Sequence, residues 1–270
     1  MWSPHDPIPV EKTFDEFVTL QNGVQVSSLV GESPTFKNAD YLFNQDRVII
    51  ELKEIQKDFG NDKNFLQKHD ELVDKIERET SWWKRLRGME PPPEYYHEVV
   101  RLFRPPLQRI LKKANRQIKE TKSELNLRDH QGLLMIVNDG FVSFPPALVR
   151  SIVDETLTHS YKSLDAWVYL NVNTYVDLPW SENAILPWIS SYSCRATDEL
   201  VHFVDDLGRC WRKFLETKIG PFDFSEEAPC GTVNWDEAVA VAPENRDQIY
   251  ERKGWQSDET NSKKSGPDNQ

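Results

Sequence analysis

The chain has 270 residues and a formal net charge of −11, and its 38% hydrophobic and 29% charged content is typical of a soluble globular protein. Its apolar runs are far shorter than the ~20 residues of a membrane-spanning helix, and the N-terminus lacks the basic flank and apolar stretch of a signal peptide. Three widely spaced cysteines, Cys194, Cys210 and Cys230, indicate neither a disulfide framework nor a zinc site, so a cytoplasmic protein without a membrane partner is expected.

The first predicted elements lie before residue 56. Thr13 and Glu16 have the spacing of a capping box, which predicts a short helix that begins at Thr13 and ends near Asn22 and Gly23. Residues 24–30 are expected to form a short strand. A β-hairpin follows, with strands at 41–43 and 47–55 and a turn at 44–46, because the second strand is rich in β-branched residues.

Helices are predicted for most of the next seventy residues. Apolar side chains recur at helical spacing from 61 to 86, and the stretch GMEPPPE at 88–94 interrupts that pattern. A short helix is expected over 95–103, and a further helix begins at Pro105 and Pro106. The apolar stripe of this last helix consists of Leu107, Ile110, Leu111, Ala114, Ile118, Thr121 and Leu125.

The rest of the chain alternates strands and helices. We expect a buried strand after Gly132, an Asn138-Asp139-Gly140 turn, a helix from Pro145 to about 159, a strand over 164–173, irregular structure over 178–192 and a helix capped by Thr197. Apolar density falls after Pro243, so 243–270 is expected to be a disordered tail. This order predicts a single α/β domain over residues 1–242, with a mixed central sheet flanked by helices.

The predicted hairpin carries charges inside an apolar strand. Because side chains alternate along a strand, Glu51 and Lys53 share one face, and the hairpin brings Asp40 to the same end. Buried charges are costly unless they are paired, hydrogen-bonded or bound to a metal. Two carboxylates suit Mg²⁺ or Mn²⁺, which lowers the pKa of a bound water. The alternative is an ion pair on a half-exposed sheet face.

The same residues resemble a known motif. Asp40, ten intervening residues and then Glu51-Leu52-Lys53 at the end of a β-branched strand resemble the PD-(D/E)XK nuclease superfamily, although Ala39 replaces the proline of the motif. The resemblance implies that Asp40 and Glu51 bind the metal and that Lys53 assists the attacking water. It also implies a restriction-endonuclease-like core, with a helical insertion at about 56–103. The hairpin, together with KKANRQIKETK, is also similar to an uncharacterised group of bacterial proteins.

The helix after the hairpin is expected to complete the site. Members of the superfamily often place Gln, Arg or Lys on this helix, and at about 100° per residue Gln117 lies on the shoulder of its apolar stripe. Arg109, Lys113 and Arg116 lie further round on that side, where they would hold phosphates, whereas Lys122 lies on the other side. The alternatives are an ordinary surface position for Gln117 and a solvated basic face.

Together these patterns favour a Mg²⁺- or Mn²⁺-dependent nuclease that hydrolyses phosphodiester bonds, with DNA favoured over RNA. The superfamily suggests defence against foreign nucleic acid, and the catalytic residues would be Asp40, Glu51, Lys53 and Gln117. The alternatives are a catalytically inactive module that binds a partner protein, nucleic acid or a second copy of the chain, and a purely structural α/β protein in which Lys53 is ion-paired.

Glu16 and a group of three residues on a later helix also have the chemistry of metal ligands. Glu16 could supply a ligand from the first helix, but its predicted capping role explains it better. Glu199, His202 and Asp206 share one face of the helix that follows Thr197, and a polar helix surface is the favoured interpretation because no fourth ligand accompanies them.

Overall fold

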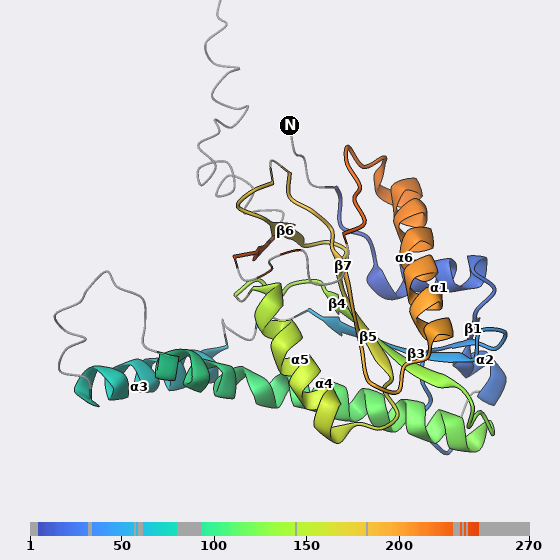
Figure 1. Cartoon of the computed structure of the whole chain (residues 1–270), viewed down its shortest axis with the longest axis horizontal. Coiled ribbons are helices and arrows are strands. Elements are labelled where there is room, and N and C mark those ends of the chain that lie inside the picture. The colour runs from blue at the N-terminus through green and yellow to red at the C-terminus, as the bar shows by residue number, and fades with distance from the viewer. Residues whose placement is uncertain are drawn as a thin grey trace, which may run out of the picture.

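The computed structural model describes residues 5–31, 34–56, 58, 62–79, 93–143, 145–181, 183–228, 233, 235 and 237–242. Helices and strands alternate along this part of the chain (Figure 1). The elements are α1 Val10–Leu20, β1 Val24–Gln25, α2 Val26–Val30, β2 Tyr41–Phe43, β3 Val48–Ile55, α3 Lys63–Glu79, α4 Pro93–Glu124, β4 Gln131–Asn138, α5 Pro146–Ser160, β5 Ala166–Asn171, β6 Tyr175–Asp177, β7 Trp188–Tyr192, α6 Asp198–Ile219 and β8 Val239–Val241.

The centre of the fold is a six-stranded mixed sheet. Its strand order is β1-β2-β3-β4-β5-β7. The three central strands β3, β4 and β5 are parallel, and the outer pairs are antiparallel. β6 and β8 form a separate two-stranded antiparallel sheet. The predicted α/β class with a mixed central sheet is therefore confirmed.

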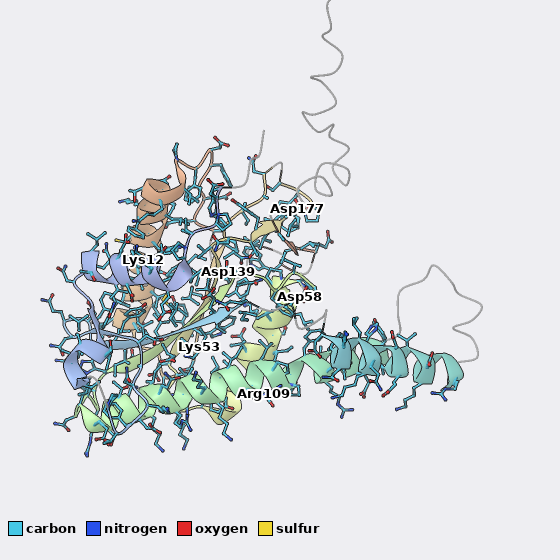
Figure 2. All side chains as sticks on the ribbon, turned by 180° about the vertical axis from the view of Figure 1, so that it is seen from behind. Lys12, Lys53, Asp58, Arg109, Asp139 and Asp177 are labelled. Atoms are coloured by element: carbon cyan, nitrogen blue, oxygen red, sulfur yellow. The ribbon has the colours of Figure 1, made fainter. Side chains whose placement is uncertain are left out.

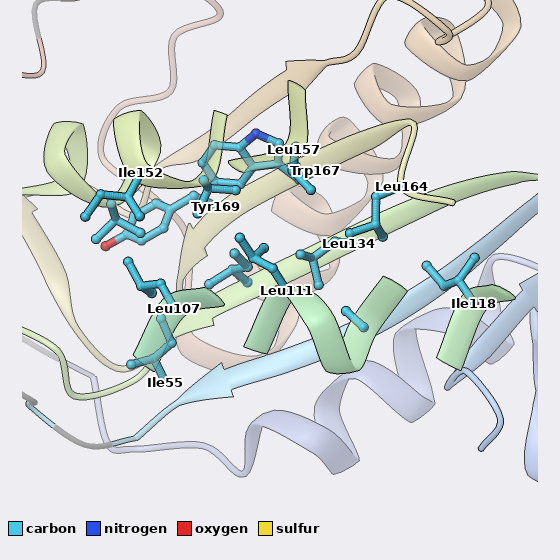
Figure 3. Packing of buried hydrophobic residues seen from close by; sticks show 14 of the residues in the cluster. Ile55, Leu107, Leu111, Ile118, Leu134, Ile152, Leu157, Leu164, Trp167 and Tyr169 are labelled. Atoms are coloured by element: carbon cyan, nitrogen blue, oxygen red, sulfur yellow. The ribbon is translucent and has the colours of Figure 1, made fainter. Parts of the chain in front are cut away.

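Helices cover both faces of the sheet, as Figure 1 shows. α4 and α5 pack on one face, and α1 and α6 pack on the other. β3 contributes to both sides by alternation: Ile49 and Ile55 belong to the core under α4, and Val48 and Ile50 belong to the core under α1 and α6. Figure 3 shows the first of these cores, in which α4 and α5 place the following side chains against β3, β4 and β5: Leu107, Leu111, Ile118, Ile152 and Leu157.

The α3–α4 pair extends beyond the sheet as an arm (Figure 1). Ring contacts join the two helices: the centroids of Phe65 and Phe103 are 4.2 Å apart, and His69 Nε2 is 2.8 Å from the hydroxyl oxygen of Tyr95. Instead of the two predicted helices, α4 is one helix of 32 residues that passes through Pro105 and Pro106. α3 and the first turns of α4 occupy the position of the predicted insertion at about 56–103.

Several local predictions are wrong at the N-terminus. α1 begins at Val10 after Pro9, and the Thr13 hydroxyl donates to the Pro9 carbonyl at 2.6 Å instead of capping the helix. Glu16 forms an ion pair with Lys218 of α6, so no capping box exists. Residues 24–30 form a two-residue strand and a short helix, not one strand.

The predicted hairpin, the strand after Gly132 and the helix after Thr197 are confirmed. The side chain of Thr197 accepts the Leu200 N–H at 3.3 Å and caps α6. The turn after β4 is built by Asn138, whose side-chain oxygen accepts the Phe141 N–H at 2.7 Å. Residues 178–192, predicted to be irregular, include the edge strand β7. The predicted break at 88–94 lies largely, and the tail at 243–270 entirely, outside the described residues.

Within the described segments, no helix combines the length and the apolar character that crossing a membrane requires.

Candidate functional site

The hairpin brings Asp40 and Glu51 face to face. β2 pairs with β3 through Tyr41 and Ile50, so one step further along the ladder Asp40 lies opposite Glu51. The Asp40 N–H donates to the Ile50 carbonyl at 3.2 Å. Asp40 Oδ2 accepts the Leu52 N–H at 2.7 Å. The Asp40 carboxylate is therefore fixed to the backbone of β3, beyond the last residue pair of the two strands.

Glu51 is completely buried on the face of the sheet that α4 covers. Its Oε1 forms an ion pair with Nζ of Lys53, the next residue on this face. Its Oε2 is also buried, and it has no hydrogen-bond partner among the residues that the structure describes. Figure 2 shows Lys53 on β3 between α1, which carries Lys12, and α4, which carries Arg109. One carboxylate oxygen of Glu51 is thus held by Lys53, and the other has no partner among the described residues.

The burial of this site shifts the pKa values of both carboxyl groups upward. Burial raises the pKa of Glu51 to about 8, and the negative charge of Asp40 adds to the rise, whereas Lys53 and Lys113 oppose it. Burial likewise raises the pKa of Asp40, against the opposing effects of Lys53, the Leu52 N–H and Lys113. An ionised pair is therefore unfavourable here unless additional positive charge is present.

Glu11 is a neighbour of the site that the sequence interpretation missed. It lies in the first turn of α1, and its negative charge adds to the rise in the pKa of Asp40. Asp15, one turn later, accepts a hydrogen bond from the Tyr41 hydroxyl at 3.0 Å. No local pattern predicts that Glu11 lies near Asp40, because this proximity depends on how α1 packs on the sheet, and the incorrect helix start at Thr13 left Glu11 outside the helix.

Gln117 reaches the loop before Asp40. Its side chain is largely buried, and Nε2 donates to the Asn38 carbonyl at 2.8 Å. Its Oε1 is buried and has no hydrogen-bond partner within the described residues. The structure therefore brings Gln117 next to the Asp40 loop, with its amide nitrogen bonded to that loop.

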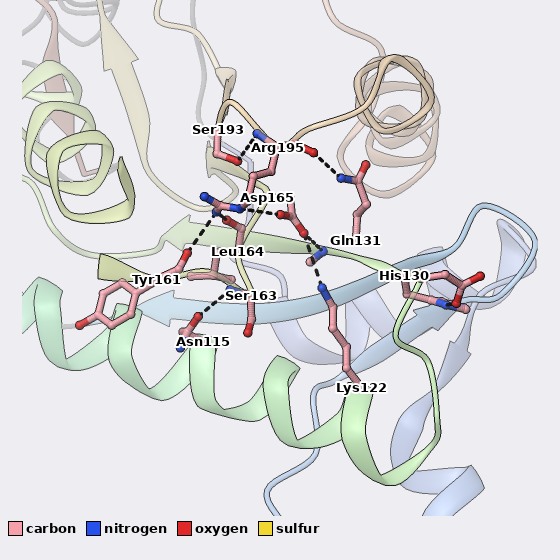
Figure 4. A network of polar contacts seen from close by, with 12 residues as sticks. Asn115, Lys122, His130, Gln131, Tyr161, Ser163, Leu164, Asp165, Ser193 and Arg195 are labelled. Atoms are coloured by element: carbon pink, nitrogen blue, oxygen red, sulfur yellow. Dashed lines mark hydrogen bonds and ion pairs between the residues drawn. The ribbon is translucent and has the colours of Figure 1, made fainter. Parts of the chain in front are cut away.

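The three predicted phosphate-binding residues differ in their surroundings. Lys113 is exposed and close enough to lower the pKa values of both carboxyl groups. Arg109 is exposed, and its Nε donates to the Pro105 carbonyl of the same helix at 3.3 Å. Arg116 pairs with Glu120 at 3.8 Å. Lys122, on the other side of the helix, is half-buried and pairs with Asp165 at 3.5 Å (Figure 4).

The donor set of the site fits a small divalent cation. Asp40 and Glu51 supply carboxylate oxygens, and Glu51 Oε2 is a buried oxygen without a hydrogen-bond partner in the described part of the chain. The described residues contain no cluster of three or more His, Cys, Asp or Glu side chains suited to a metal ion. Mg²⁺ typically takes one or two carboxylates and keeps several waters, so a two-carboxylate site agrees with its chemistry.

The alternative acidic group on α6 is occupied by local contacts. His202 Nδ1 lies 2.6 Å from the Asp198 carbonyl, and Asp206 pairs with Arg209. Both residues are exposed. The favoured interpretation of Glu199, His202 and Asp206 as a polar helix surface agrees with these contacts.

No known protein family, curated protein or solved structure matches this chain. Its function must therefore be inferred from the chemistry of its own residues.

Proposed function

We propose that the chain is a metal-dependent nuclease with a restriction-endonuclease-like core, which hydrolyses phosphodiester bonds of nucleic acid at Asp40, Glu51 and Lys53. The observation that supports it most is the Glu51 carboxylate, which is fully buried, lies opposite Asp40 and keeps one oxygen without a hydrogen-bond partner in the described structure. The mixed sheet with helices on both faces supports the same proposal, because it places the motif on a central strand.

A purely structural role explains Glu51 poorly. Removing a carboxylate from water is costly, and an apolar residue in its place is often neutral or stabilising. Here the cost is visible in the pKa of Glu51, which is raised to about 8 although Lys53 is in contact. A divalent cation bound between Glu51 and Asp40 would offset the repulsion of the two carboxylates.

Each residue has a role that follows from its position. Asp40 and Glu51 would hold Mg²⁺ or Mn²⁺, which when bound lowers the pKa of a water and stabilises charge on phosphate. Lys53 Nζ contacts Glu51 at the partly open end of the site, so it can donate a hydrogen bond to the attacking water or to a phosphate oxygen. Lys113 and Arg109, exposed on α4, would hold the flanking phosphates, with DNA as the first substrate to test.

Nuclease activity is tested with purified protein on single- and double-stranded DNA and RNA. Cleavage should require Mg²⁺ or Mn²⁺ and stop in EDTA. Lys53→Ala should remove most of the activity and retain the fold by circular dichroism, whereas Lys119→Ala, an exposed lysine elsewhere on α4, should behave like wild type. Metal-dependent cleavage that survives in Lys53→Ala protein would contradict the assignment of Lys53.

Nucleic-acid binding is tested through its salt dependence. Each phosphate-contacting Lys or Arg adds about 0.7 to 0.9 to the slope of log affinity against log salt. In catalytically inactive Lys53→Ala protein, Lys113→Ala with Arg109→Ala should flatten that slope by roughly one to two. Lys119→Ala is the matched control, because Lys119 is also an exposed lysine of α4. Lys122 is unsuitable as a control because it forms an ion pair with Asp165. Equal slopes in all three proteins would show that this face of α4 is only solvated.

The Lys53–Glu51 ion pair favours a second candidate, a nuclease-like module that binds a partner without catalysis. In that case the contact with Lys53 is sufficient to hold Glu51 in the folded protein, and no cation is needed. The two functions differ in the effect of Mn²⁺ on melting temperature. A catalytic site is stabilised by the ion through mass action, and this rise should be absent in Glu51→Gln protein. No cleavage and no rise in wild type would favour the binding module.

A further inference from the structure

The loop that carries Asp40 is held by side chains of α4. Three backbone groups in residues 37–39 bond to Gln117, Glu120 and Thr121, which lie within about one turn of that helix. The Lys37 N–H donates to Glu120 Oε2 at 2.7 Å, and the Asn38 carbonyl accepts from Gln117 at 2.8 Å. The Ala39 N–H donates to the hydroxyl oxygen of Thr121 at 2.8 Å. These bonds fix the loop to α4 directly before the chain enters β2.

The bond to Thr121 is the most protected of the three. Thr121 and Ala39 are both completely buried, whereas the bond from Lys37 to Glu120 is exposed. A buried N–H that loses its acceptor is costly, so the Ala39 amide restrains the chain directly next to Asp40. On the other side, the Asp40 carboxylate accepts the Leu52 N–H at 2.7 Å.

We propose that Thr121 is a positioning residue for Asp40: its hydroxyl anchors the Ala39 amide to α4 and thereby sets where the Asp40 carboxylate meets β3. Thr121 does not need to touch metal or substrate for this role. The proposal rests on the proposed function only where it concerns metal binding, because the placement of Asp40 can be measured in the protein without any ligand.

Thr121→Val tests the role of the hydroxyl, since valine keeps the branched shape of threonine and removes the acceptor. Thr156→Val is the matched control. Thr156 is also a buried helical threonine, and its hydroxyl donates to Ile152 within α5 at 2.7 Å. Thr121→Ser retains the hydroxyl and should restore the wild-type result.

The first measurement is hydrogen exchange of the Leu52 amide, which reports directly on its bond to Asp40. In Thr121→Val protein this amide should exchange at least tenfold faster, approaching its rate in Asp40→Ala protein. The amides of β4 should keep their wild-type rates, which separates local displacement of Asp40 from general destabilisation. Wild-type exchange of Leu52 in Thr121→Val protein, or equal acceleration in Thr156→Val protein, would overturn the proposal.

The second measurement is the dissociation constant for Mn²⁺ alone. Thr121→Val should weaken binding about tenfold, and Thr121→Ser and Thr156→Val should not. If wild type binds no Mn²⁺ but Leu52 exchange rises in Thr121→Val protein, the positioning role stands and the proposed metal site fails. If Leu52 exchange rises and Mn²⁺ binding is unchanged, the proposed role of Thr121 in forming the metal site is overturned.

Discussion

Glu51→Gln isolates the cost of the buried carboxylate. Glutamine keeps the shape of the side chain and an oxygen that can accept a hydrogen bond from Lys53, but it carries no charge. In the wild-type protein, burial and the neighbouring Asp40 raise the pKa of Glu51 from an ordinary value of 4.5 to about 8. Between these two pH values the folded protein holds a proton on Glu51 that the unfolded chain has released.

The sign of the effect follows from this proton difference. Stability falls with rising pH wherever the folded state binds more protons than the unfolded state. Wild type should therefore lose stability progressively from about pH 4.5 to about pH 8 through Glu51. Each pH unit of pKa difference corresponds to about 1.4 kcal/mol. Over this interval the loss has an upper limit of about 5 kcal/mol, and a value of about 2 to 4 kcal/mol is expected once the site relaxes.

Urea unfolding from pH 5 to pH 9 in EDTA measures this contribution. Wild type and Glu51→Gln should have similar free energies of unfolding at pH 5, and the variant should be more stable above pH 8. Asp139, whose pKa is raised to about 6 by burial and by its hydrogen bond with Glu54, affects both proteins and cancels in the comparison. Parallel pH profiles for the two proteins would refute the argument that Glu51 is held in a destabilising environment.

Three further substitutions test the fold around the site by urea unfolding. Asp165→Asn should lower the free energy of unfolding by about 3 kcal/mol, because Asp165 is buried and both the half-buried Lys122 and the exposed Arg195 lose their counter-charge. Gly132→Ala should cost about 4 kcal/mol or more, because a Cβ there would lie 2.0 Å from the Ser163 carbonyl oxygen. Leu111→Ala, in the core under α4, should cost about 2 to 5 kcal/mol through the cavity it leaves. A loss below 1 kcal/mol for any of them would contradict the packing described for that residue.

The hairpin and the stripe on α4 were predictable because their signals are local. The second strand of the hairpin contains three consecutive β-branched residues, Val48, Ile49 and Ile50, and the turn is short. The edge strand β7 was not predictable in the same way. Its five residues follow Pro187, and their strand pairing in the described structure is with β5, so the strand depends on tertiary structure. Pro105 and Pro106 suggested a helix start, but packing of Phe103 and Leu107 in one core keeps α4 continuous.

The spacing of Asp40, Glu51 and Lys53 indicated that they would meet, and the structure places them together. The sequence did not indicate which of the three would be fully buried, because that depends on how α4 covers β3. The sequence also did not reveal the role of Thr121, because its position in the apolar stripe of the helix indicated packing alone. Its bond to Ala39 arises only when the loop over residues 37–39 lies against α4.

The parallel pairing of β3 with β4 also has a consequence for biosynthesis. Glu51 pairs with Leu134, and the crossover between the two strands contains both α3 and α4. A ribosome that adds 5–20 residues per second needs roughly 4 to 17 s to proceed from Glu51 to the end of β4. Until α4 and then β4 have been synthesised, the hairpin lacks its covering helix and its neighbouring strand, and Glu51 stays hydrated as an ordinary ionised carboxylate. The nascent hairpin is thus more polar than its folded counterpart, which protects an otherwise apolar strand from pairing with other chains before β4 arrives.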